Sequence, residues 1–146
     1  MKKILVAIMA VSTVVLSFTS CGEKTADVNV YPIAGKTFQA TEAGGTVKIT
    51  FHTNFKTTFV VNSITGTVIN DNFVWDMDLD TIPGEANTRM LYIKFASGTM
   101  DKTTGEIVSG KKAYEGKYNG QNCIIYPTYP EVDKSSSLVY HPFLGE

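Results

Sequence analysis

The feature that most constrains the fold is a period-two alternation of apolar and polar residues through the middle of the chain. In residues 46–51, Val47, Ile49 and Phe51 alternate with threonine and lysine. The alternation returns in three further segments, at 55–61, 73–79 and 91–95. Successive side chains of a β-strand point to opposite faces, so this pattern predicts strands with one buried and one solvated face. Antiparallel sheets tolerate such a wet face, and we therefore expect an all-β fold.

Turn-forming residues divide the alternating segments. Asn62–Gly66 and Asn70–Asn72 are both predicted to be turns, because asparagine, aspartate and glycine tolerate turn conformations. Shorter strands are expected at 106–109, 112–118, 121–126 and 137–141. No segment has the period of a long helix. Short strands separated by turns are typical of an antiparallel barrel or sandwich.

The N-terminus has a second distinctive pattern. Two lysines precede an apolar run over residues 4–18, and Thr19-Ser20 then leads to Cys21. The run is shorter than the roughly 20 residues that a membrane-spanning helix needs. A basic start, a short apolar stretch and small residues before a cleavage point are typical of a signal peptide, here residues 1–20. The segment resembles the bacterial lipoprotein type, in which the cysteine is lipidated and becomes the mature N-terminus.

Lipidation of Cys21 implies three parts: a signal peptide over 1–20, a lipidated N-terminus and tether over 21–32, and a single β domain over 33–146. Each buried methylene contributes about 0.8 kcal/mol, so two or more acyl chains would anchor the protein to a membrane effectively permanently. Gly22, not aspartate, follows the cysteine. By resemblance to the sorting rule of enteric bacteria, this favours the outer membrane of the cell envelope. The sequence leaves the periplasmic and the surface face equally open.

Charge and cysteine content exclude some partners. Removal of residues 1–20 takes away two lysines and leaves 11 basic and 14 acidic residues, a net charge of −3. A nucleic-acid partner is not expected, because there is no basic excess to neutralise phosphates. If Cys21 carries lipid, Cys123 is the one free thiol. Its apolar surroundings in Asn122–Tyr126 predict a small buried residue and not a nucleophile.

No motif nominates an enzyme or a cofactor. Phe73, Trp75, Met77 and Leu79 are expected to share one strand face, opposite Asp76, Asp78 and Asp80. Three carboxylates on one face could gather a cation such as calcium, but a solvated strand face explains them equally well, and we assign no metal site. The two histidines lack partners at ligand spacing, and no serine lies in a Gly-x-Ser-x-Gly elbow. We expect no catalytic residues.

The order of the segments carries a family resemblance. The order runs through Gly35–Phe38, Thr46–Phe51, Phe55–Val61, Phe73–Asp78 and Leu91–Phe95. It resembles the small lipocalin-like lipoproteins of Bacteroidota, which are up-and-down β-barrels of about eight strands. The resemblance implies a barrel that binds a small apolar or amphipathic ligand.

Four residues are the ligand-binding candidates on this hypothesis: Phe59, Trp75, Ile93 and Tyr118. An eight-stranded barrel is just wide enough either to fill with its own side chains or to hold one small ligand. The alternative is a structural or interaction β-sandwich that docks a protein or glycan at the cell envelope. A cavity of a few hundred cubic ångströms would favour the ligand hypothesis.

Overall fold

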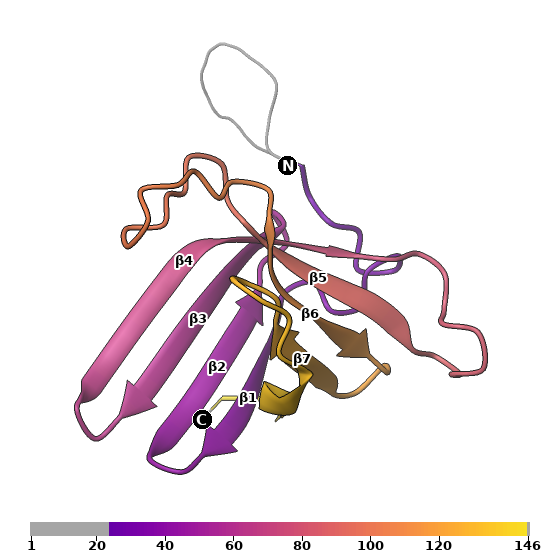
Figure 1. Cartoon of the computed structure of the whole chain (residues 1–146). Coiled ribbons are helices and arrows are strands. Elements are labelled where there is room, and N and C mark those ends of the chain that lie inside the picture. Colours follow the sequence, from indigo (N-terminus) through magenta and orange to yellow (C-terminus); the bar gives the residue numbers. More distant parts are fainter. Residues whose placement is uncertain (1–23, 146) are drawn as a thin grey trace, which may run out of the picture.

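The computed structural model describes residues 24–145, which form a closed antiparallel β-barrel (Figure 1). Each strand pairs with its sequence neighbours, and β8 pairs with β1 to close the sheet. The elements are β1 (Lys36–Glu42), β2 (Gly45–Phe51), β3 (Lys56–Ser63), β4 (Gly66–Met77), β5 (Arg89–Phe95), β6 (Lys112–Tyr118), β7 (Cys123–Pro127), the 3-10 helix η2 (Lys134–Ser136) and β8 (Leu138–Pro142). The expected all-β barrel is confirmed, and the sandwich alternative is wrong because one sheet closes on itself. Within residues 24–145, no helix has the length and apolar character needed to span a bilayer.

The period-two alternation decides which side chains enter the barrel. In the β1–β2 hairpin, Phe38 lies opposite Ile49 and Ala40 lies opposite Val47. Three of these four are buried, and Val47 is half-buried near the strand end. Because facing residues of an antiparallel pair share one side of the sheet, the apolar set of each strand meets that of the next. The predicted inward face of β2 is therefore confirmed.

A β-bulge stands where the sequence predicts a turn at residues 70–72. β4 continues through these residues, so the turn prediction is wrong. Thr57 of β3 pairs with Phe73, whereas Phe59 pairs with Asn70, so three steps along β4 lie opposite two along β3. A bulge inserts an extra residue into one strand and bends it. Even-numbered residues of β4 consequently face the interior before the bulge, and odd-numbered ones face it afterwards.

Two other sequence predictions are wrong, whereas the last strands agree closely. β4 ends at Met77, so Leu79 lies beyond the strand and is 64% exposed. The strand expected at 106–109 is absent, because the described β5–β6 connection contains only one bridge, between Met100 and Ile107. By contrast, β6, β7 and β8 lie within two residues of their predicted bounds.

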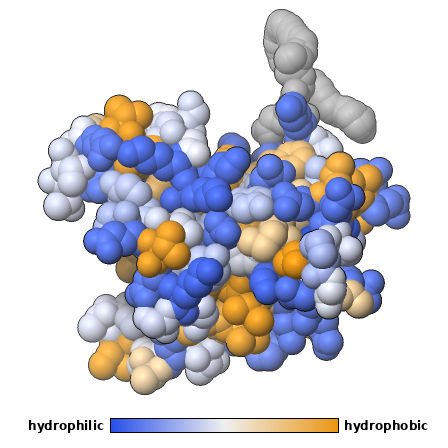
Figure 2. Space-filling view, turned by 45° about the vertical axis from the view of Figure 1, so that its right-hand side comes forward, coloured by the Kyte–Doolittle hydropathy of each residue, from blue (hydrophilic) through white to orange (hydrophobic). Residues whose placement is uncertain are grey.

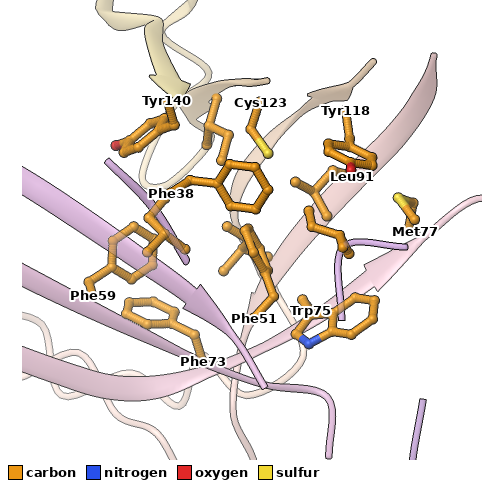
Figure 3. Packing of buried hydrophobic residues seen from close by; sticks show 14 of the residues in the cluster. Phe38, Phe51, Phe59, Phe73, Trp75, Met77, Leu91, Tyr118, Cys123 and Tyr140 are labelled. Atoms are coloured by element: carbon orange, nitrogen blue, oxygen red, sulfur yellow. The ribbon is translucent and has the colours of Figure 1, made fainter. Parts of the chain in front are cut away.

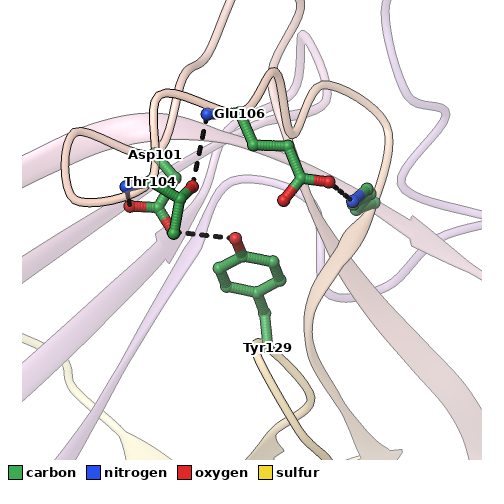
Figure 4. Close-up of polar contacts among 5 residues, drawn as sticks. Asp101, Thr104, Glu106 and Tyr129 are labelled. Carbon is green, nitrogen blue, oxygen red and sulfur yellow. Dashed lines mark hydrogen bonds and ion pairs between the residues drawn. The ribbon is translucent and has the colours of Figure 1, made fainter.

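The long β5–β6 connection is held by hydrogen bonds within itself and by one to the segment that follows β7 (Figure 4). The Tyr129 hydroxyl donates to Oδ2 of Asp101 at 2.8 Å. This hydrogen bond, with those from backbone N–H groups, holds the pKa of Asp101 below its usual value. Within the connection, the backbone N–H of Glu106 donates to Oγ1 of Thr104 at 3.2 Å. These contacts give residues 96–111 a defined path although they contain no strand.

The segment before β1 covers one end of the barrel. The backbone N–H of Ala26 donates to the carbonyl of Thr53 at 2.6 Å, and Ala26 is buried. Tyr31 meets the ring of Trp75 edge to face, with 5.6 Å between ring centroids. The tether expected over 21–32 therefore packs against the barrel from Ala26 onward. Residues 21–23 of that tether lie outside the described residues.

A buried threonine in the interior gives a stability prediction. Thr57 is fully buried, and its hydroxyl has no hydrogen-bond partner within residues 24–145. Burying a hydroxyl without a partner costs about 1–3 kcal/mol, whereas valine has nearly the same shape and no polar atom. We expect Thr57→Val to raise the free energy of unfolding by about 1 kcal/mol. Equilibrium denaturation in urea measures it.

Thr50→Val is the matched control, because Thr50 lies on the neighbouring strand and its hydroxyl is used. Its Oγ1 lies 2.8 Å from Oγ1 of Thr37, and removal leaves that partner unpaired. We expect Thr50→Val to lower the free energy of unfolding by about 0.5–1 kcal/mol. Equal destabilisation by the two substitutions would contradict the argument, since it would mean that the Thr57 hydroxyl also forms a stabilising bond.

Candidate functional site

The interior of the barrel is filled with side chains only at the end covered by residues 26–34. There the rings meet edge to face: Phe38 with Phe51 at 5.9 Å, and Phe51 with Trp75 at 6.2 Å between centroids (Figure 3). Aromatic rings packed in this way contribute attraction beyond the burial of their surface. The indole N–H of Trp75 donates to the carbonyl of His52 at 2.9 Å, which satisfies its one polar atom. This half is a close-packed core.

The other half holds a cavity of about 350 Å³. It is lined by residues of β1, β2, β3 and β4 and by residues of β6, β7, η2 and β8. Its lining consists of Glu42, Val47, Phe59, Val61, Val68, Asn70, Phe73, Tyr114, Ile125, Pro127, Ser136, Leu138 and Tyr140. Several of these residues are exposed, so the cavity opens to solvent at the barrel end away from residues 26–34.

Three aromatic rings form the floor of the cavity. Phe59 contacts Tyr114 at 4.9 Å and Phe73 at 5.1 Å between ring centroids. Phe59 and Phe73 are also buried, so they separate the cavity from the close-packed half. The floor depends on the β4 bulge, because the bulge turns Phe73 inward beside Phe59.

The structure divides the four sequence-predicted ligand-binding residues. Phe59 lines the cavity, whereas Trp75, Ile93 and Tyr118 lie in the hydrophobic core and are not part of its lining. Trp75 and Ile93 face each other across β4 and β5, in register. All four are inward-facing, as the alternation predicts, but their level along the barrel differs. Period-two alternation identifies a face and carries no information on depth.

The four candidates do not include the polar residues of the lining. Tyr114 and Tyr140 line the cavity, and neither hydroxyl forms a hydrogen bond within the described chain. A phenol is protonated at neutral pH even at its usual pKa of about 10, and burial raises the pKa of both tyrosines further. Glu42 has the same inward parity as Phe38 and Ala40 and lies at the rim. The alternation in β1 places Glu42 on the inward-facing side of the strand. This sequence pattern could have identified it as a lining residue.

The three carboxylates Asp76, Asp78 and Asp80 do not share a strand face, because β4 ends between the first and the second. Oδ2 of Asp78 accepts a hydrogen bond from the Tyr92 hydroxyl at 3.1 Å. Oδ1 of Asp76 accepts from the backbone N–H of Met77 at 2.9 Å. Across residues 24–145, no three histidine, cysteine or acidic side chains are grouped so that they could hold a metal ion.

The chain was compared with protein-family models, with curated proteins and with solved structures, and none of the three comparisons found a match. The geometry of the cavity and the sequence pattern of the N-terminus are therefore the two indications of function.

Cys123 occupies the packed half of the barrel and takes no part in the cavity lining. Its side chain is fully buried, and burial raises the pKa of the thiol well above its usual value. The thiolate is the nucleophilic form of cysteine, and here it is suppressed at neutral and mildly alkaline pH. This arrangement agrees with the small buried residue that the sequence predicts.

We expect Cys123 to resist alkylation by iodoacetamide at pH 8 until the barrel opens. Reaction should be at least about 100-fold slower than in urea-unfolded protein, because an opening costs about 3 kcal/mol or more in a stable core. Mass spectrometry of a Cys21→Ser protein follows the one remaining thiol. Adding Ser97→Cys supplies an exposed thiol that should react rapidly in the same sample. Equal rates at the two positions would contradict the inert assignment.

Proposed function

We propose that the barrel binds a small apolar or amphipathic ligand in the cavity at its open end, and that it does so without catalysing a reaction. The observation that carries this proposal is the cavity of about 350 Å³ above the aromatic floor of Phe59, Phe73 and Tyr114. Ligand sites are concave, mostly apolar and supplied with a few polar groups, and volumes of roughly 300–1,000 Å³ are typical. The cavity has each of these properties.

The lining combines apolar surface with a few polar groups, which suits an amphipathic molecule. Val47, Val61 and Val68, from β2, β3 and β4, supply apolar surface. The lining also includes the free hydroxyls of Tyr114 and Tyr140. An apolar body could bury its surface against the valines and the floor, with a polar group directed to the tyrosines. Burial of apolar surface would supply most of the affinity, at about 25 cal/mol per Å².

We further propose that the protein is a lipoprotein of the cell envelope, anchored in the outer membrane through acyl chains on Cys21. Four residues separate Cys21 from Ala26, where packing against the barrel begins. Such a connection reaches at most about 18 Å. The anchor would therefore hold the covered end of the barrel close to the lipid surface. The cavity opens at the other end and would face away from that membrane.

Blocking the cavity tests the binding proposal. Val68 lines the cavity at its rim and is 64% exposed, so Val68→Trp can place an indole in the opening with little strain. We expect residues 21–146 with Cys21→Ser to bind the neutral dye N-phenyl-1-naphthylamine with micromolar affinity. Val68→Trp should weaken this binding at least tenfold, which fluorescence titration measures.

Ile69→Trp is the matched control. Ile69 is the next residue of β4, is 67% exposed and is not part of the lining. We expect this substitution to leave dye binding within about twofold of the parent. Equal loss in both variants, or no binding by the parent protein, would contradict the proposal. The latter outcome would favour the docking alternative, for which the exposed apolar β3–β4 hairpin, with Ile64 96% exposed, is the natural surface.

Replacing the modified cysteine tests the anchor. In the native host, the parent chain should incorporate labelled palmitate and fractionate with membranes. Cys21→Ser should abolish both, because serine cannot form the thioether that carries the diacylglycerol. Cys123→Ser is the matched control and should keep the label, since that thiol is buried. Labelled palmitate in the Cys21→Ser protein would contradict the proposed site.

A further inference from the structure

The charge distribution around the cavity carries an inference that rests on the proposed binding function and refines it. Glu42 is the one charged residue among the lining side chains, and no lysine, arginine or histidine accompanies it. Its carboxylate forms no ion pair or hydrogen bond within residues 24–145. It is therefore available to a ligand, and a ligand in the cavity meets negative charge at the rim.

The placement of Glu42 follows from the register of β1. Glu42 pairs with Gly45 at the turn of the β1–β2 hairpin, two positions beyond Ala40, which faces inward. A strand repeats its facing every two residues, so the carboxylate lies on the inner side of the rim. Glu42 is exposed and lines the cavity, so its carboxylate is open both to solvent and to a ligand.

Tyr140 supplies a polar group of the lining close to Glu42. Tyr140 belongs to β8, the strand that pairs with β1, and the Glu42 carboxylate is near enough to raise the pKa of its phenol further. Figure 3 shows the Tyr140 hydroxyl directed away from Phe38 and Cys123, which belong to the close-packed half. A hydroxyl oxygen accepts hydrogen bonds, and so does a carboxylate. The phenol can also donate, whereas the ionised carboxylate only accepts, so the preference for a donating group comes from Glu42.

We propose that the cavity selects apolar molecules whose polar end is cationic, such as primary amines, over those whose polar end is a carboxylate. An ammonium group donates three hydrogen bonds and would pair with the Glu42 carboxylate. A carboxylate at the same place would meet a like charge, with no basic side chain in the lining to offset the repulsion. The charge of the polar end would therefore distinguish two classes of ligand that have the same apolar body.

Three probes of equal chain length test the proposal: hexylamine, hexanoic acid and hexan-1-ol. Each competes with N-phenyl-1-naphthylamine for residues 21–146 with Cys21→Ser, a protein that contains every described residue of the barrel. At pH 7 the amine is cationic and the acid anionic. We expect the amine to compete at about tenfold lower concentration than the acid, and the difference to shrink in 0.5 M salt.

Glu42→Gln isolates the carboxylate. The amine-to-acid ratio should fall about tenfold in this variant, while competition by the uncharged alcohol stays within twofold and reports an intact cavity. Asp80→Asn is the charge-matched control, because Asp80 is exposed and is not part of the lining. It should leave the ratio unchanged.

The outcomes separate the two proposals. If the dye and all three probes fail to bind the parent protein, the proposed function is wrong, and the charge preference falls with it. If the dye and the alcohol bind but the acid competes as well as the amine, binding stands and the charge preference is overturned. A ratio that Asp80→Asn changes as much as Glu42→Gln does would also overturn it, because the preference would then reflect net charge alone.

Discussion

The rest of the structure depends on one constraint, which is the closure of the sheet by strands of unequal length. β8 pairs with β1 through only two residue pairs, Phe38 with Pro142 and Gln39 with His141. β3 and β4 have 8 and 12 residues, whereas β7 and β8 have five each. A closed eight-stranded barrel is just wide enough to fill with its own side chains or to hold one small ligand. Here the end covered by residues 26–34 is filled by the hydrophobic core, whereas the other end stays open around the cavity.

The bulge in β4 links this closure to the cavity floor. β4 pairs with β5 only from Phe73 to Met77, so its first half extends beyond the point where β5 ends. Without the extra residue, the alternation set by Val68 and Asn70 would direct Phe73 outward. The bulge restores it to the interior, where it packs against Phe59 and Tyr114. The bulge thus allows β4 to place inward-facing residues in both halves of the barrel.

The sequence predicts the fold class well and the site poorly, for one physical reason. Alternation in 46–51 and 91–95 reports which side of a strand is buried, and the structure confirms it. The turn prediction at Asn70–Asn72 is wrong because residues that favour turns also suit a bulge. Depth along the barrel depends on register and strand length, which are set by pairing between distant segments. Hence Trp75 and Phe59 look alike in the sequence, although only Phe59 reaches the cavity.

Two of the exposed apolar residues at the open end, Val61 and Val68, belong to the cavity. On the face shown in Figure 2, apolar residues occur in small groups separated by hydrophilic ones. Val61 and Val68 are 38% and 64% exposed, yet both line the cavity, opposite each other across β3 and β4. Apolar side chains at such positions leave water against hydrocarbon, which an apolar ligand would displace. Glu42 at the same rim would then favour apolar ligands whose polar end does not repel its carboxylate.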